Sequence, residues 1–399
     1  MPASENKAFE KLRLIADDFG ATATKVNESS LRRKNHAGLA LSDIGASRAA
    51  GIILLNKIRA IARENISLRD RHAVILNSFR IIEENLKRQS LLLSRLETEK
   101  SIGAGHSQSI AGYNRNLAET IRKGIPLLEK IIAAGNTIIL HDSQIVMRRQ
   151  FQKERASRLE KSARKVLRDA ETAVDGSRLN SRRGSALSKR FRGIGLLVKK
   201  NNMKEIKKIM AEAGAGWKLA AKVNARSKSQ FDFADRVNGF TRKLRDEAQD
   251  IMGLVVEKHR LFRADLEPIA ELAVLVAVEL MEYAVNQDNI RGLLADDAAI
   301  GPEAYRLRND LAALITNACA SARAISNLNF DMSGCIASNA RFEESAVELT
   351  REEDTGYARI SAEVERMTEA ARYPVEGSAR NITNGKELVK ILSDIMKKR

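Results

Sequence analysis

The 399-residue chain contains little cysteine, little proline and few aromatic side chains, which make up 4% of it. Its two cysteines, Cys319 and Cys335, are too few for a disulfide framework and do not have metal-ligand spacing. No proline lies between Pro2 and Pro126, or between Pro126 and Pro268. Because proline is excluded from helix interiors, these long proline-free stretches indicate long helices.

Long hydrophobic runs are also missing. The first 20 residues alternate charged and apolar side chains, and therefore lack the apolar core of a signal peptide. The best candidate for a membrane span, residues 267–285, contains Glu271, Glu279 and Glu282, and its uninterrupted apolar run covers only residues 272–278. This run is far shorter than the roughly 20 residues that cross a bilayer. The sequence therefore predicts a buried helix here, and a cytoplasmic chain.

Enzyme motifs are incomplete or absent. The tripeptide of a kinase occurs within residues 17–20, but no glycine-rich phosphate loop or catalytic loop accompanies it. Residues 184–195 lack the order of a phosphate-binding loop. The histidines lack metal-ligand spacing; they are His36, His72, His106, His141 and His259. We therefore expect no enzyme activity, no catalytic residue, no metal site and no cofactor.

The strongest positive signal is a heptad repeat. An apolar content of 44% indicates a folded chain. A 4–3 alternation of apolar residues predicts one helix over about 54–96. We interpret its first positions as a self-association seam, formed by Leu54, Ile61, Leu68, Ile75, Ile82 and Leu96. The polar residues Asn65, His72 and Gln89 interrupt the apolar pattern, as residues that specify a homodimer do.

A second seam runs from about 110 to 166, after a glycine-containing turn at 101–109. Two long helices joined by a short turn should lie antiparallel. The predicted fold class is therefore all-α: an elongated helical bundle with an antiparallel coiled-coil hairpin and additional helices. The expected additional helices lie at about 5–18, 186–212, 216–263, 267–290, 302–373 and after 384–385, and we expect a kink or short break near Pro126.

The expected domain boundaries follow composition. Residues 1–175 would form the N-terminal helix and hairpin, 176–215 a basic connector with short amphipathic helices, and 216–399 a C-terminal helical region. The predicted interruptions at 175–185 and 213–216 rest on glycine and small polar residues, which usually mark turns.

Positive charge is concentrated in one part of the chain. The formal net charge is +17, and residues 148–208 contribute 20 Lys or Arg against six Asp or Glu, which is +14. Within this region a helix would place apolar residues on one face, namely Leu187, Phe191, Ile194 and Val198. Such a face either lies on an anionic membrane surface or packs on the bundle. The expected anion-binding residues are Arg182, Arg183, Lys189, Arg190, Arg192, Lys199 and Lys200.

These features predict a non-catalytic helical scaffold or interaction protein that forms a homodimer. Its basic surface would meet an anionic partner, either a membrane surface, where the protein would be peripheral at the inner face, or an acidic protein. A nucleic-acid-associated protein is the alternative, although the basic region offers only Phe151 and Phe191 for stacking on bases. A signalling or adaptor helical bundle is the second alternative.

Overall fold

The computed structural model describes residues 3–98, 103–269, 271, 274–275, 278, 281 and 302–397. Four long helices dominate it: α1 (Ala3–Thr98), α2 (Ala104–Phe191), α4 (Met203–Leu261) and α6 (Pro302–Lys397). The short helix α3 (Ile194–Lys199) lies between α2 and α4, and a π-helical turn, η1 (Phe262–Leu266), follows α4. All regular structure in the described residues is helical, so the predicted all-α class is confirmed.

The chain divides into two compact units, each assembled from segments that are distant in sequence. Unit 1 comprises Met1–Ile52, Phe151–Gln249 and Thr350–Arg399; unit 2 comprises Ile53–Gln150 and Asp250–Leu349. This division differs from the expected regions 1–175, 176–215 and 216–399, whose boundaries fall inside α2 and α4. Packing between antiparallel helices brings distant segments into one unit, and the composition along the chain does not show which segments pack together.

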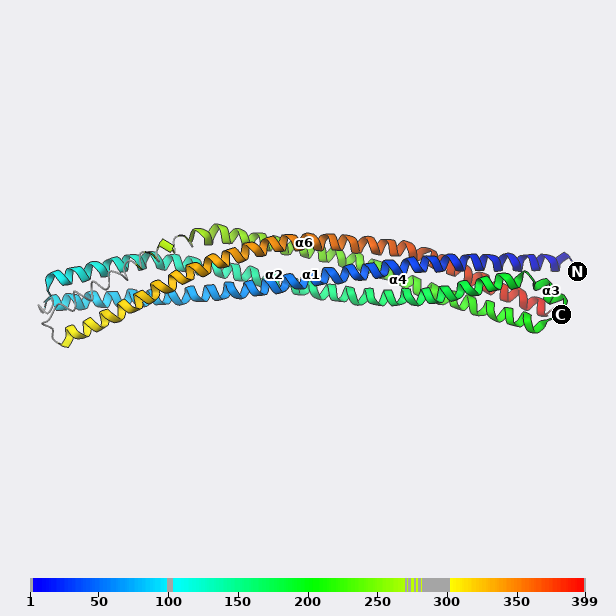
Figure 1. Ribbon diagram of the computed structural model, residues 1–399, viewed down its shortest axis with the longest axis horizontal. Helices are drawn as coiled ribbons and strands as arrows, with labels where there is room; N and C mark the ends of the chain where they lie inside the picture. Colours follow the sequence, from blue (N-terminus) through cyan, green and yellow to red (C-terminus); the bar gives the residue numbers. More distant parts are fainter. Residues whose placement is uncertain are drawn as a thin grey trace. The chain divides into compact units, whose positions relative to one another are not determined.

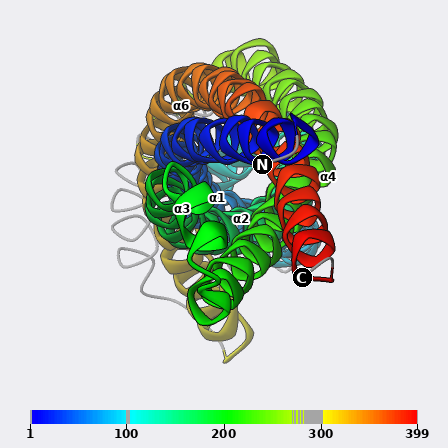
Figure 2. The same cartoon turned by 90° about the vertical axis from the view of Figure 1, so that its right-hand side faces the viewer.

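Unit 1 is an antiparallel four-helix bundle. The α1–α2 contacts Asn27–Ser177 and Arg48–Glu160 give the antiparallel register of that pair, since one residue number rises as the other falls. Contacts in the same sense join α2 to α4, α4 to α6, and α1 to α6; examples are Asp169–Arg226, Arg245–Asp354 and Lys11–Glu387. The segments contain roughly 50 residues, on the order of 70 Å of helix, so unit 1 is elongated. Figure 2 views it from the end that carries α3 and both termini.

Unit 2 contains the predicted hairpin. Asn65 donates a hydrogen bond to Asp142 (2.8 Å), and Arg80 donates to Glu129 (2.7 Å), so this part of α1 and α2 is antiparallel, as expected. The core between them includes Phe79, Ile121 and Ile138, and α4 and α6 add residues to it. Figure 1 shows the ribbons of these four helices.

Several predicted helix boundaries were wrong, because the helices continue through them. Helix α1 is uninterrupted from residue 3, α2 through Pro126 and 175–185, α4 through 213–216, and α6 through 373–385. The glycines in three of these stretches lie where helices approach closely. A Cβ on Gly184 would stand 2.9 Å from the Gly20 Cα, and one on Gly385 would stand 2.5 Å from the Trp217 Cβ. A Cβ on Gly216 would meet the Phe19 ring at 3.0 Å.

Two expectations lie largely outside the described residues: the helix at 267–290 and the side chain of Leu96. Within the described part, α1 holds one 18-residue window with a mean hydropathy of 1.4, apolar enough to cross a membrane by composition. Only 28% of that window is buried, about the two-in-seven share that a heptad helix buries in a bundle. A single stretch of this kind is weak evidence for a membrane span.

Candidate functional site

The predicted basic region forms one end of unit 1, which we call the basic turn end: residues 182–208, from the last turns of α2 through α3 to the first turns of α4. The chain reverses here in two steps. Gly193 separates α2 from α3, and Asn201 adopts a φ of 50° between α3 and α4, a conformation that asparagine tolerates better than most residues. Asn202 then accepts a hydrogen bond from the Glu205 backbone N–H (3.2 Å), which caps α4.

The apolar face of this region is buried inside the bundle. Leu187, Phe191, Ile194 and Val198 are at most 1% exposed. They pack in a cluster with Leu12 of α1, Ile206 of α4 and Leu388 of α6. Of the two readings of the amphipathic pattern, core packing is therefore the observed one, and this face is not available to a membrane surface.

The cations of the turn end remain largely unpaired. Arg190 pairs with Glu212 (2.7 Å) and lies 4.0 Å from Glu205. The other six predicted anion-binding residues form no ion pair with a described residue; they are Arg182, Arg183, Lys189, Arg192, Lys199 and Lys200. Lys204, Lys207 and Lys208 are exposed beside them. The structure thus brings the predicted residues together on one end of unit 1, and six of the seven have no ion-pair partner among the described residues.

In the preceding part of the basic region, residues 148–181, acidic residues of the bundle neutralise some of the cations. Arg155 pairs with Glu247 of α4 in unit 1, and Arg148 pairs with Asp250 in unit 2 (2.5 Å). Glu160 accepts hydrogen bonds from Arg164 (2.5 and 3.2 Å) and from Arg48. The uncompensated charge is consequently densest at the turn end.

The predicted self-association seam is used within the chain. Leu54, Ile61, Leu68, Ile75 and Ile82 are all buried in unit 2. Their neighbours come from α2, α4 and α6, including Ile145, Val255 and Phe342. The interpretation of this seam as a homodimer interface is therefore corrected, because the chain's own helices occupy it.

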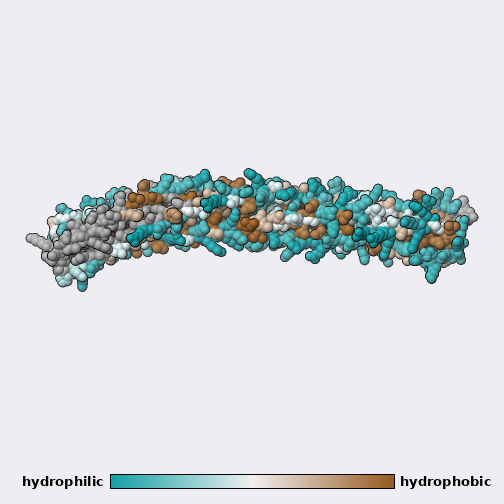
Figure 3. Space-filling model, viewed as in Figure 1, coloured by the Kyte–Doolittle hydropathy of each residue, from teal (hydrophilic) through white to brown (hydrophobic). Residues whose placement is uncertain are grey.

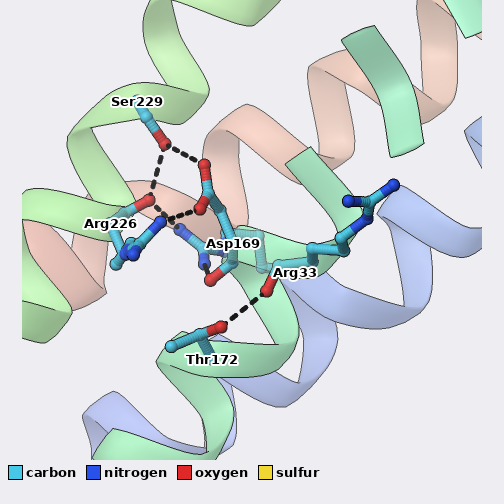
Figure 4. A network of polar contacts seen from close by, with 6 residues as sticks. Arg33, Asp169, Thr172, Arg226 and Ser229 are labelled. Carbon is cyan, nitrogen blue, oxygen red and sulfur yellow. Dashed lines mark hydrogen bonds and ion pairs between the residues drawn. The ribbon is translucent and has the colours of Figure 1, made fainter. Parts of the chain in front are cut away.

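Sequence reasoning missed the buried polar residues of unit 1. Arg33 of α1 is 1% exposed, and its guanidinium donates to the backbone carbonyls of Arg226 (3.3 Å) and Asp169 (3.4 Å). Figure 4 shows this contact between the helices, where the Asp169 carboxylate also accepts hydrogen bonds from Arg226 and Ser229. Burial lowers the pKa of Arg33 to about 10, although the Asp169 charge opposes this shift. Extending the heptad back from Leu54 in three steps of seven residues would have placed Arg33 in the core.

Unit 2 has a comparable polar layer, with one residue from each long helix. Asp142 pairs with Lys258 and accepts a hydrogen bond from Asn65, and the side-chain amide of Asn339 donates to the Asn65 side-chain oxygen Oδ1 (3.1 Å). Burial lowers the pKa of Lys258, while Asp142 acts in the opposite direction. The sequence indicated Asn65 as a seam residue, but no local spacing connects it to its three partners.

The scattered histidines contact bundle residues. The ring of His36 lies 2.8 Å from a Glu363 carboxylate oxygen, and the ring of His72 lies 2.8 Å from the Leu68 carbonyl. Among the described residues, no three His, Cys, Asp or Glu side chains form a group that could hold a metal ion. A scan against protein-family models, a search of curated proteins and a search of solved structures each found no match for this chain.

Proposed function

We propose that this protein is a non-catalytic helical scaffold that uses the basic turn end of unit 1 to dock on an anionic membrane surface. One observation carries the proposal: six of the seven predicted anion-binding side chains are gathered at this end without ion-pair partners among the described residues. A lysine or arginine close to an anionic leaflet contributes about 1 kcal/mol to binding. Six such residues suffice for reversible attachment.

Exposed apolar side chains favour a membrane over nucleic acid. Leu196 of α3 is 64% exposed beside Lys199 and Lys200. The only aromatic side chain within the basic turn end, Phe191, is 1% exposed and therefore cannot stack on bases. Elsewhere the surface in Figure 3 is mainly hydrophilic, with hydrophobic side chains scattered in small patches. The scaffold role needs no second copy of the chain, since the heptad seam is filled within it.

Vesicle co-sedimentation tests the proposal. The full chain should sediment with vesicles of phosphatidylcholine mixed with phosphatidylglycerol, but not with phosphatidylcholine alone. Replacing Arg192, Lys199 and Lys200 by glutamine should weaken this binding on the order of 100-fold, given about 1 kcal/mol for each cation. Increasing salt should weaken it as well, because exposed charges are screened.

The matched control neutralises three exposed cations of α2, Arg158, Lys161 and Lys165, by the same substitution. This variant should retain most of its binding to the vesicles. Equal losses in the two variants, or tighter binding to single- or double-stranded DNA or RNA than to anionic vesicles, would contradict the proposal. The second result would favour the nucleic-acid alternative.

A further inference from the structure

A groove at the basic turn end combines cations with apolar side chains. Residues 6–13 of α1 form one wall, and residues 191–199 form the other. The apolar lining includes Phe9, Ile194 and Leu196, and the charged lining consists of Lys7, Glu10, Arg13, Arg192 and Lys199. The groove therefore carries four cations against one carboxylate.

Several other acidic residues near this end contact residues of the bundle. Glu387 pairs with Lys11 (2.7 Å), and Asp18 pairs with Arg380 (2.7 Å). Asp17 accepts a hydrogen bond from Ser188 and also lies 4.0 Å from the guanidinium of Arg13, which lines the groove. Three groove cations, Lys7, Arg192 and Lys199, thus have no ion-pair partner among the described residues, and an anion would find a complementary site there.

The two halves of the groove differ in depth. Ile194 is 1% exposed and forms the floor, whereas Leu196 is 64% exposed and stands at the rim with Lys199. A free phosphate ion would be bound by the cations but would leave Leu196 in water. An amphiphile with a phosphate headgroup fits both the cations and the exposed leucine. Its headgroup meets the cations, while Leu196 enters the apolar part of the membrane interface.

We infer that this groove binds the phosphate headgroup of an anionic phospholipid, with Arg192 and Lys199 on the phosphate and Leu196 in the acyl boundary. This inference rests on the proposed membrane docking and specifies its site. It also assigns a role to the first turns of α1, whose Lys7, Phe9 and Arg13 lie far in sequence from the basic region.

The test compares two double variants in the vesicle assay. Arg192→Gln/Lys199→Gln removes two groove cations and should weaken binding to phosphatidylglycerol vesicles about 30-fold. Lys207→Gln/Lys208→Gln removes two exposed cations of α4 that do not line the groove, and should weaken it less. If both pairs lose binding equally, the groove assignment is overturned while membrane docking stands. If the unaltered chain binds no anionic vesicle, docking itself fails and the groove assignment with it.

A second pair of variants separates a lipid from a soluble phosphate. Leu196→Ser should lower vesicle affinity several-fold at a salt concentration that screens charge, while Leu179→Ser, at a 43% exposed leucine of α2, should not. Soluble glycerol 3-phosphate should compete poorly. Strong competition by it, together with unchanged binding of Leu196→Ser, would show a phosphate-ion site and overturn the lipid assignment. Thermal unfolding monitored by circular dichroism verifies that each variant is folded.

Discussion

At the scale of single residues, the stability of this protein depends on polar groups that are buried between helices. Arg33 and Lys258 both carry charge into a bundle core, and each has a lowered pKa because burial disfavours the charged form. Such groups persist in a core when hydrogen bonds and counter-charges accompany them. They also fix helix register, since a slip of one heptad would separate a charge from its partner.

The Lys258–Asp142 pair provides the first prediction. Lys258→Met leaves a buried carboxylate without its cation, and should lower the free energy of unfolding by about 3–5 kcal/mol. The double variant Asp142→Asn/Lys258→Met removes both charges and should lose less than the single variant. Urea unfolding of the three proteins measures the difference. A double variant that is less stable than the single one would show that the pair does not act through charge.

Glu160 gives a prediction for pH. A hydrogen bond from Arg164, together with Arg48, lowers the pKa of this carboxyl below its ordinary value. Its charged form therefore stabilises the fold above the ordinary pKa, and this contribution is lost as the pH falls through the pKa of the folded state. Glu160→Gln should cost about 1 kcal/mol at neutral pH. The difference should shrink as the pH falls below the ordinary pKa of a glutamate, because the carboxyl then becomes protonated in the folded state as well. A difference that is constant from neutral to acid pH would contradict this assignment.

At the scale of helices, glycine has opposite effects at two kinds of position. Gly184 lies in a close contact between α1 and α2, whereas a Cβ on Gly214 would meet no atom within 4 Å. Both are helical, so both should gain up to about 1 kcal/mol from the helix propensity of alanine. Only at Gly184 would the backbone of α1 or α2 have to move to accommodate the methyl group of alanine.

The matched variants Gly184→Ala and Gly214→Ala should therefore change stability in opposite directions. Gly214→Ala should raise the free energy of unfolding by about 0.5–1 kcal/mol. Gly184→Ala should lower it, because the clash with Gly20 outweighs the gain in propensity. Thermal and urea unfolding provide the measurement. Stabilisation by both substitutions would mean that α1 and α2 can separate at this point at no cost.

At the scale of the whole molecule, the question is whether the heptad seam packs within one chain or joins two chains. Leu54 is 1% exposed inside unit 2, and the adjacent Ile53 is 52% exposed. Leu54→Asp buries a charge in the core and should cost several kcal/mol, roughly 3–5. Ile53→Asp should change stability by no more than about 0.5 kcal/mol.

Native mass measurement completes this comparison. Leu54→Asp is expected to lose helix content or to unfold at a lower temperature, without a specific change from one oligomeric state to another. Should it instead stay folded with half the mass of the unaltered protein, the seam would join two chains.

How well the sequence predicted the fold depended on the kind of sequence pattern. Regular heptads identified the antiparallel hairpin and its buried residues, such as Leu68 and Ile138, because apolar periodicity determines which face of a helix is buried. The positions of helix ends were predicted less well. Gly184, Gly216 and Gly385 looked like breaks, yet each lies where another helix leaves no room for a side chain. Only the neighbouring helix reveals which kind of glycine is present.

The candidate site shows the same division. The excess of Lys and Arg between residues 148 and 208 is a property of the sequence. The sequence does not show which of these cations are paired, because the acidic partners of the paired ones, such as Glu247 and Glu212, come from another helix. Likewise, the apolar face with Leu187 and Phe191 could be recognised from its spacing, but its burial depended on α1 and α6.

The sequence by itself determined that the chain forms long helices, which of their faces are apolar, and where the net charge is concentrated, since these depend on composition and on short-range periodicity. Tertiary structure decided which charges are neutralised, which glycines mark contacts and which apolar faces are covered. Each of these depends on side chains that are far apart in sequence and adjacent only once antiparallel helices have packed.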